Sequence, residues 1–122
     1  MRYAAAAFCG VLACCAPQAA PASHLAMIDI QPILEPLAYR ELLGKKCGVQ
    51  DTALKTAFIA DLKVAGASLE LLTEAGAEAD RIAEAERDTP NEYVCTAELF
   101  ESTEKNAAAA QAAWTELKKR KS

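Results

Sequence analysis

Apolar residues recur at helical spacing in two long stretches of the chain. Between residues 52 and 88, alternating steps of four and three connect Phe58, Leu62, Ala65, Leu69, Leu72, Gly76, Ala79 and Ala83. After residue 89, similar steps connect Tyr93, Thr96, Phe100, Thr103, Ala107, Ala110, Trp114 and Leu117. Such heptad-like seams are typical of helices that pack lengthwise against one another. The pattern therefore predicts an all-α protein, a small antiparallel bundle of three or four helices.

A shorter helix is predicted over residues 36–47. Proline suits the first turn of a helix but not its interior, so Pro32 and Pro36 favour a start near residue 36. Residues 23–35 are accordingly predicted to form a loose N-terminal arm. Lys45 and Lys46 complement the negative C-terminal end of the helix dipole. Gly48 can adopt the left-handed conformation that commonly ends a helix. The face expected to be buried comprises Tyr39, Leu42, Leu43 and Cys47.

Two further helix starts have local signals. Asp51 is a suitable N-cap for the helical region that follows it. Thr89 and Glu92 form a T-x-x-E capping box, with Pro90 at the first helical position. We therefore expect the last helix to begin at Thr89.

The N-terminus resembles a secretory signal peptide in its composition. A short basic start, Met1-Arg2-Tyr3, precedes an uncharged apolar run over residues 4–16 and a small-residue region that ends Ala20-Pro21-Ala22. The run is too short to span a membrane, and the ending fits an A-x-A cleavage site. We expect cleavage after Ala22, a periplasmic or secreted location, and one helical domain over residues 23–122.

Residues 1–22, which we call the leader, have a second interpretation, because they contain an imperfect lipoprotein box. Val11-Leu12-Ala13-Cys14 places Cys14 where bacterial lipoproteins carry their lipidated cysteine, although Leu12 stands one position nearer than the usual leucine. Cys14 is therefore a candidate lipidation site. The two alternatives, cleavage after Ala22 and a lipid anchor at Cys14, remain open at this point.

The two cysteines beyond the leader constrain the topology. Cys47 and Cys95 are expected to form a disulfide, because an exported chain meets an oxidising environment. A single straight helix between them would hold the sulfurs tens of Å apart, at about 1.5 Å per residue. The region must therefore fold back on itself. Glycine can break a helix, and Gly76 is the favoured position, with Gly66 as a competitor because Ser68 could cap a new helix.

Charge and motif content argue against catalysis. Of the 13 basic residues only Arg2 lies in the leader, and all 17 acidic residues follow it, so the exported chain has a net charge of −5. It contains no GxSxG, HExxH, P-loop, GxGxxG or CxxC motif. His24, the single histidine, could bind a metal together with a new terminal amine, but no second ligand lies nearby in sequence. We expect no catalytic, cofactor-binding or metal-binding residues.

Three other features have ordinary structural explanations. Acidic residues crowd the stretch from Glu70 to Glu104, which we interpret as a solvated helix face, although it could respond to pH or bind a basic partner. The basic tail over residues 118–121 complements the helix dipole and is a weak patch for lipid or nucleic acid. Trp114, Phe100 and Tyr93 are expected in the core rather than in a ligand site.

Some of these residues resemble known groups of proteins. Lys45-Lys46-Cys47-Gly48, together with Asp88-Thr89-Pro90 and Tyr93-Val94-Cys95, is similar to uncharacterised small two-cysteine exported helical proteins of alphaproteobacteria. That resemblance implies a fold and no activity. A weaker resemblance, to HdeA-like acid-stress periplasmic chaperones, is carried by Cys47, Cys95 and the segment Trp114-Thr115-Glu116-Leu117-Lys118-Lys119. It implies dissociation and unfolding at low pH, but the helix breaks and the Ala-rich segment do not match that family.

We therefore expect a non-catalytic exported protein of the bacterial envelope that acts by binding a protein partner. An acid-stress periplasmic chaperone and an envelope lipoprotein anchored at Cys14 are the alternatives. We expect no nucleic-acid partner and no membrane span. The sequence identifies neither the partner nor the oligomeric state.

Overall fold

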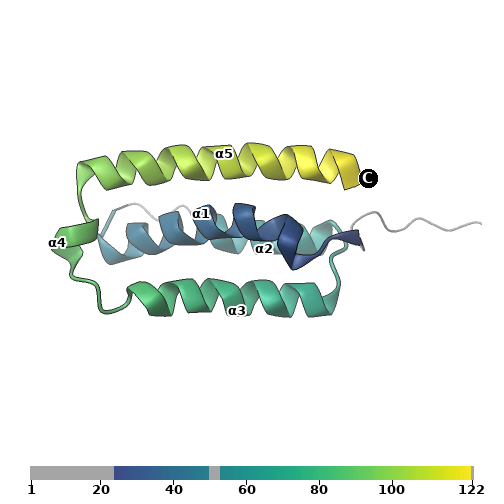
Figure 1. Cartoon of the computed structure of the whole chain (residues 1–122), viewed down its shortest axis with the longest axis horizontal. Helices are drawn as coiled ribbons and strands as arrows, with labels where there is room; N and C mark the ends of the chain where they lie inside the picture. The colour runs from purple at the N-terminus through teal and green to yellow at the C-terminus, as the bar shows by residue number, and fades with distance from the viewer. Residues whose placement is uncertain (1–23, 50–52, 122) are drawn as a thin grey trace, which may run out of the picture.

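The chain folds as an antiparallel helical bundle in the computed structural model, which describes residues 24–49 and 53–121 (Figure 1). Successive long helices run in alternate directions, and no strand occurs within these two ranges. Cys47 and Cys95 form a disulfide with their Cα atoms 5.5 Å apart. The predicted all-α bundle and the predicted cysteine pair are therefore confirmed. The helices are α1 (Met27–Lys46), α2 (Leu54–Val64), α3 (Leu69–Glu86), the single-turn α4 (Asn91–Val94) and α5 (Ala97–Lys121).

Helix α1 occupies the centre of the bundle and packs against α2, α3 and α5 (Figure 1). A helix covered on several sides needs no continuous polar face, and this explains why α1 lacks a clear amphipathic pattern. Helix α5 packs mainly on α1 and leaves grooves on either side of that contact. The buried residues of α1 are distributed around much of its circumference: Ile30, Ile33, Leu34, Leu37, Ala38, Arg40, Glu41, Leu43 and Gly44.

The expectation of a loose arm over residues 23–35 is wrong from Met27 onward, because these residues form the first half of α1. Pro32 and Pro36 lie inside the helix, where each removes one backbone hydrogen bond. The carbonyl groups that lose a partner belong to Ile28 and Pro32, four residues earlier, and the side chains of both are exposed. Solvent on that side can hydrate the released carbonyls. The predicted end of this helix is confirmed: Gly48 follows it with φ of +69°.

The chain turns back at Gly66 and not at the favoured Gly76. Gly66 has φ of +93°, a conformation that a side chain disfavours, and the hydroxyl of Ser68 accepts a hydrogen bond from the Leu71 amide at 3.1 Å. Gly76 lies within α3. After this turn the buried positions no longer follow the predicted seam, and Leu69, a predicted seam residue, is 80% exposed. Helix α3 instead buries Leu71, Ala75, Ala79 and Ile82.

The last long helix begins later than predicted. Residues 91–94 form the separate turn α4, which has no side-chain cap, so the expected capping box of Thr89 and Glu92 is not made. Helix α5 is capped by Thr96, whose hydroxyl accepts a hydrogen bond from the Leu99 amide at 3.1 Å. Tyr93, expected in the seam, is 68% exposed. Thr96 is exposed as well, and Phe100, expected in the core, is half-buried. From Thr103 onward the seam is confirmed by the buried residues of α5: Thr103, Ala107, Ala110, Trp114 and Leu117.

Three polar residues of α1 bond to three different neighbouring helices. Gln31 donates to Glu78 of α3 at 2.7 Å, and Arg40 contacts Glu104 of α5 at 3.4 Å. Glu41 accepts hydrogen bonds from the first turn of α2. Each contact links α1 to a helix distant in sequence and constrains the arrangement. No helix in the described part of the chain has the length and apolar character needed to cross a membrane.

Candidate functional site

An open groove of about 480 Å³ lies between α2 and α5, and Leu37 of α1 contributes to its lining. The groove exists because α2 and α5 both pack on α1 without packing extensively on each other. Its walls are mostly apolar, which suits contact with an apolar ligand or polypeptide segment. The lining residues are Leu37, Leu54, Ala57, Phe58, Ala60, Asp61, Val64, Gln111 and Trp114.

Two aromatic rings join the walls of this groove. Phe58 of α2 and Trp114 of α5 meet edge to face, with ring centroids 5.1 Å apart. Both residues are largely buried, at 4% and 6% exposed, so they form the base of the groove rather than its rim. Trp114 was expected in the core, and the structure confirms this while also placing it against the groove.

Asp61 is the acidic group in the groove lining, and it links α2 to α5. Its Oδ2 atom accepts a hydrogen bond from the Trp114 indole at 2.5 Å and one from the Lys118 ammonium at 2.9 Å. Lys118 also lies over the Trp114 ring, 5.3 Å from its centroid. The hydrogen bonds from Lys118 and Trp114 lower the pKa of Asp61, against a smaller opposing effect of burial. The arrangement keeps Asp61 ionised at neutral pH and joins the two walls.

The position of α2, and with it one wall of the groove, depends on Glu41. This residue is 2% exposed, and its Oε1 accepts hydrogen bonds from the amides of Lys55 at 2.9 Å and Thr56 at 3.2 Å. A carboxylate from α1 thus caps the start of α2, where Ala53 has no side-chain cap of its own. The predicted cap, Asp51, lies outside the described residues.

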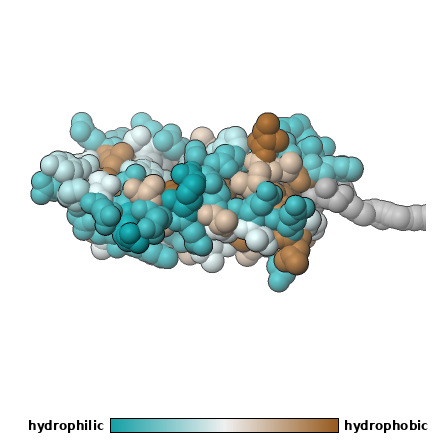
Figure 2. Space-filling model, turned by 60° about the horizontal axis from the view of Figure 1, so that its bottom comes forward, coloured by the Kyte–Doolittle hydropathy of each residue, from teal (hydrophilic) through white to brown (hydrophobic). Residues whose placement is uncertain are grey.

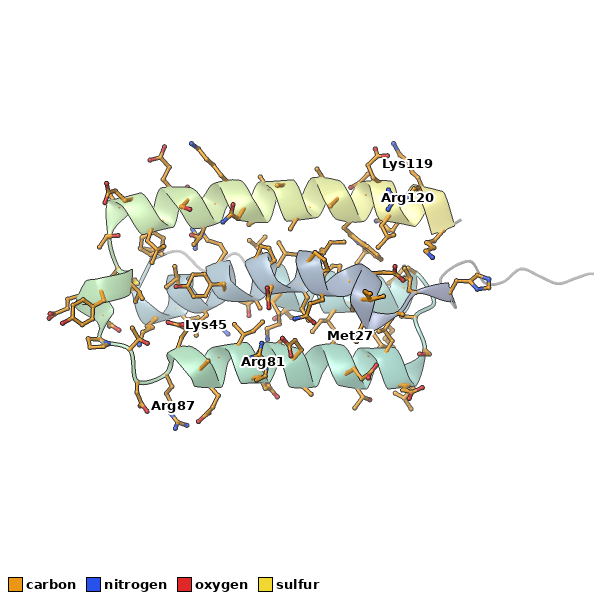
Figure 3. The ribbon with its side chains drawn as sticks, viewed as in Figure 1. Met27, Lys45, Arg81, Arg87, Lys119 and Arg120 are labelled. Atoms are coloured by element: carbon orange, nitrogen blue, oxygen red, sulfur yellow. A yellow bond between two sulfur atoms is a disulfide. The ribbon has the colours of Figure 1, made fainter. Side chains whose placement is uncertain are left out.

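A second cleft, of about 350 Å³, is more polar and lies between α3 and α5 beside α1. It includes Glu35, Tyr39, Arg81 and Glu86. Burial raises the pKa of Tyr39, and the Glu86 carboxylate adds to this effect. The hydrogen bonds from Arg81 and then from Gln31 lower the pKa of Glu78, beside the cleft, to about 2. Figure 3 shows Arg81 on α3, facing α1.

The other residues selected from the sequence are widely separated. The Cys47–Cys95 disulfide joins the end of α1 to the segment before α5. This junction lies at the opposite end of the bundle from the end of α2, the helix that contains Asp61 (Figure 1). Nearby, the Asn91 side chain donates to the Lys46 carbonyl at 3.1 Å, which further secures this junction. Cys14 and the proposed cleavage site after Ala22 lie outside the described residues. His24 is exposed, and within residues 24–49 and 53–121 no three His, Cys, Asp or Glu side chains could hold a metal ion.

Asp61 and Glu41 were missed by the sequence interpretation. Asp61 stands directly before Leu62 of the first seam, and a carboxylate beside a seam is usually solvated. Glu41 stands between Arg40 and the predicted buried residues Leu42 and Leu43, a position that could have indicated a buried polar pair. The hydrogen-bond donors that lie 14 to 57 residues away cannot be found from local sequence, although Lys45, an ion-pair partner of Glu41, is only four residues from it.

Comparison of the chain with protein-family models, with curated proteins and with solved structures found no match. The groove itself provides apolar walls and one carboxylate that is already engaged by two donors. Such a surface is suited to contact with an apolar ligand or polypeptide segment.

Proposed function

We propose that this is a non-catalytic, exported protein of the bacterial envelope that binds an apolar helical segment of a partner protein in the α2–α5 groove. The groove is the observation that carries the proposal, because it is open and apolar. Export is supported by the composition of residues 1–22 and by a disulfide, which persists in oxidising compartments.

The groove has the properties of a helix-accepting site. An amphipathic helix lays its apolar face into such grooves through residues spaced three and four apart. Ala57 and Ala60 have small side chains along one wall, which allow a second backbone to approach closely. Val64, at the end of the same wall, is 83% exposed and offers an unburied apolar contact. Helix α2 spans 11 residues, about 16 Å, which corresponds to roughly three turns of an incoming helix.

Site-specific crosslinking tests this binding mode. A photoreactive amino acid at Val64 should yield a discrete crosslinked product in envelope extract. Ala60→Arg should abolish that product, because a long charged side chain would then occupy the groove. The matched control is Ala109→Arg, since Ala109 is exposed on α5 and does not line the groove. Retention of the helical circular dichroism spectrum would show that both variants fold.

The outcomes of the crosslinking experiment separate the alternatives. All three proteins carry the photoreactive residue at Val64. A product that forms with the otherwise unchanged protein and with Ala109→Arg, but not with Ala60→Arg, supports binding in the groove. Equal capture by all three proteins contradicts it, and so does the absence of any product with the wild type. Binding by the isolated partner can then be followed through Trp114, the single tryptophan of the chain.

An acid-responsive chaperone is the second candidate, favoured by the way α5 is held. One end of α5 adjoins the Cys47–Cys95 disulfide, and the other is linked to α2 through Asp61. Protonation of Asp61 would weaken only the second link, so the C-terminal half of α5 could move away while its start remained attached. The apolar residues beneath α5 would then become available to unfolded proteins.

Acid titration distinguishes this candidate from a groove that is open to its partner at neutral pH. The chaperone candidate requires both dye binding to apolar surface and suppression of client aggregation to rise between pH 7 and about pH 3. Asp61→Asn should raise both signals already at neutral pH, because asparagine cannot form the ion pair with Lys118. An unchanged signal on acidification would exclude the chaperone candidate and leave the groove proposal intact.

A further inference from the structure

One end of the bundle bears exposed aliphatic side chains. Ile28, near the start of α1, and Val64, at the end of α2, are each 83% exposed, and Leu69, at the start of α3, is 80% exposed. All three lie where α1 begins, since α2 ends and α3 starts there (Figure 1). Figure 2 shows the larger hydrophobic areas of its face at this end. We call residues 24–30, 61–70 and 116–121 the leader-side end.

Basic residues accompany the aliphatic ones. The last turn of α5 contains Lys118, Lys119, Arg120 and Lys121, and Figure 3 shows Lys119 and Arg120 at the same end of the bundle as Met27. The leader-side end has five basic and four acidic residues, whereas the opposite end, residues 42–49 and 84–101, has three basic and six acidic ones. The protein therefore carries its negative charge away from the leader-side end.

We propose that the leader-side end docks on an anionic lipid surface. Ile28 and Leu69 insert at the level of the headgroups, and the basic end of α5 lies against the lipid phosphates. Interfacial binding of this kind combines apolar burial with attraction to anionic lipid, to which each nearby Lys or Arg contributes. The acidic opposite end is repelled by the same surface, so the charge asymmetry orients the bundle end-on.

The path of the chain also favours lipid as the occupant. Residue 24, where the described structure begins, lies at the leader-side end, so the uncharged apolar run over residues 4–16 and Cys14 join the bundle there. About ten residues separate Cys14 from Leu25, a reach of at most roughly 35 Å. An anchor at Cys14 would hold the leader-side end close to the membrane. Stable attachment generally needs two membrane signals, and the docking surface would supply one of them.

Vesicle binding tests the proposal with the protein recovered from the envelope after export. The probe is a vesicle of phosphatidylethanolamine and phosphatidylglycerol that carries a small fraction of dansyl-labelled lipid, and energy transfer from Trp114 reports proximity. We expect binding at low salt that weakens as salt screens the charges. Leu69→Glu and Ile28→Glu should each reduce the partition coefficient by about tenfold, because each loses an apolar contact and gains a repelled charge.

Tyr93→Glu is the matched control, because Tyr93 is also exposed and apolar in part but lies at the opposite end, in α4. It should change the partition coefficient by less than about twofold. Equal losses for Tyr93→Glu and Leu69→Glu would overturn the proposal, as would wild-type protein that fails to bind anionic vesicles at low salt. Equal binding to pure phosphatidylcholine vesicles would refute the requirement for anionic lipid. Leu69 and Ile28 do not line the α2–α5 groove, so these outcomes are independent of partner binding there.

Discussion

Removal of the Glu41 carboxylate should destabilise the bundle more than any change to an exposed charge. Glu41 is almost fully buried and caps the start of α2 with its Oε1 atom. Its Oε2 atom accepts a hydrogen bond from the Thr56 hydroxyl at 3.3 Å and lies 3.5 Å from the ammonium groups of Lys45 and Lys55. Glu41→Ala would therefore leave two backbone amides and two cations without this partner.

The expected magnitude follows from these contacts. Removing one member of a buried charged network costs about 3–5 kcal/mol, and loss of a helix cap alone costs about 1 kcal/mol. The Lys45 side chain is 59% exposed, so its ion pair contributes little. We expect Glu41→Ala to cost about 3 kcal/mol. Glu41→Gln should cost about 1–2 kcal/mol, because glutamine keeps one oxygen for the amides of α2 but places its NH₂ group against the lysines.

Urea unfolding measures this difference. Circular dichroism at 222 nm reports the helices, and Trp114 fluorescence reports the α2–α5 side of the bundle. With a urea dependence of roughly 1–1.5 kcal/mol/M for a domain of this size, a loss of 3 kcal/mol lowers the midpoint by about 2–3 M. Lys45→Met is the matched control and should cost less than about 0.5 kcal/mol. If Glu41→Ala falls within 0.5 kcal/mol of the wild type, the proposed cap does not hold α2 in place.

Three further predictions concern the turn, the disulfide and Asp61. Gly76→Ala should raise the melting temperature through about 0.5–1 kcal/mol of helix propensity, because nothing lies within 4 Å of the added Cβ, whereas Gly66→Ala should lower it because φ is +93° there. If both changes shift the melting temperature in the same direction, the assignment of the turn to Gly66 is contradicted. Replacement of Cys47 and Cys95 by serine should cost about 4 kcal/mol in urea unfolding, from a separation of 48 residues, and a loss under about 1 kcal/mol would count against the chain-entropy argument. The pKa of Asp61 is lower in the folded protein than in the unfolded chain. Ionised Asp61 therefore stabilises the fold at pH values above the unfolded-state pKa, and this stabilisation is lost as the pH falls through the folded-state pKa. Asp61→Asn should therefore be less stable than the wild type at pH 7 and approach it once the pH falls below the lowered folded-state pKa of Asp61; a constant difference across the range would disprove the linkage.

The sequence pattern succeeded where the structure depends on local or periodic features. The seam from Thr103 to Leu117 is buried as predicted, because a helix covered on one side keeps its apolar residues on that side. Gly48 stops α1 as expected, since its φ of +69° is a local property that glycine readily adopts. The two cysteines beyond the leader left one pairing, and the structure contains it.

The candidate groove could be predicted only in part. Phe58 and Trp114 were both assigned to seams, and both contact the groove. Their mutual contact, and the carboxylate of Asp61 that joins their helices, could not be inferred because 53 residues separate Asp61 from Trp114. A periodic pattern identifies which side of a helix is buried, but it does not identify the helix that covers it.

The residue pattern alone predicts that this chain is helical, that it folds back between its paired cysteines, and which face of α5 is buried. The central place of α1, the turn at Gly66 and the groove beside Asp61 become visible only once the helices are packed together. The physical reason is the same in each case. Helix propensity, periodicity and glycine conformation act over a few residues, whereas the burial of Glu41 and the position of Asp61 depend on groups that folding brings together from distant parts of the chain.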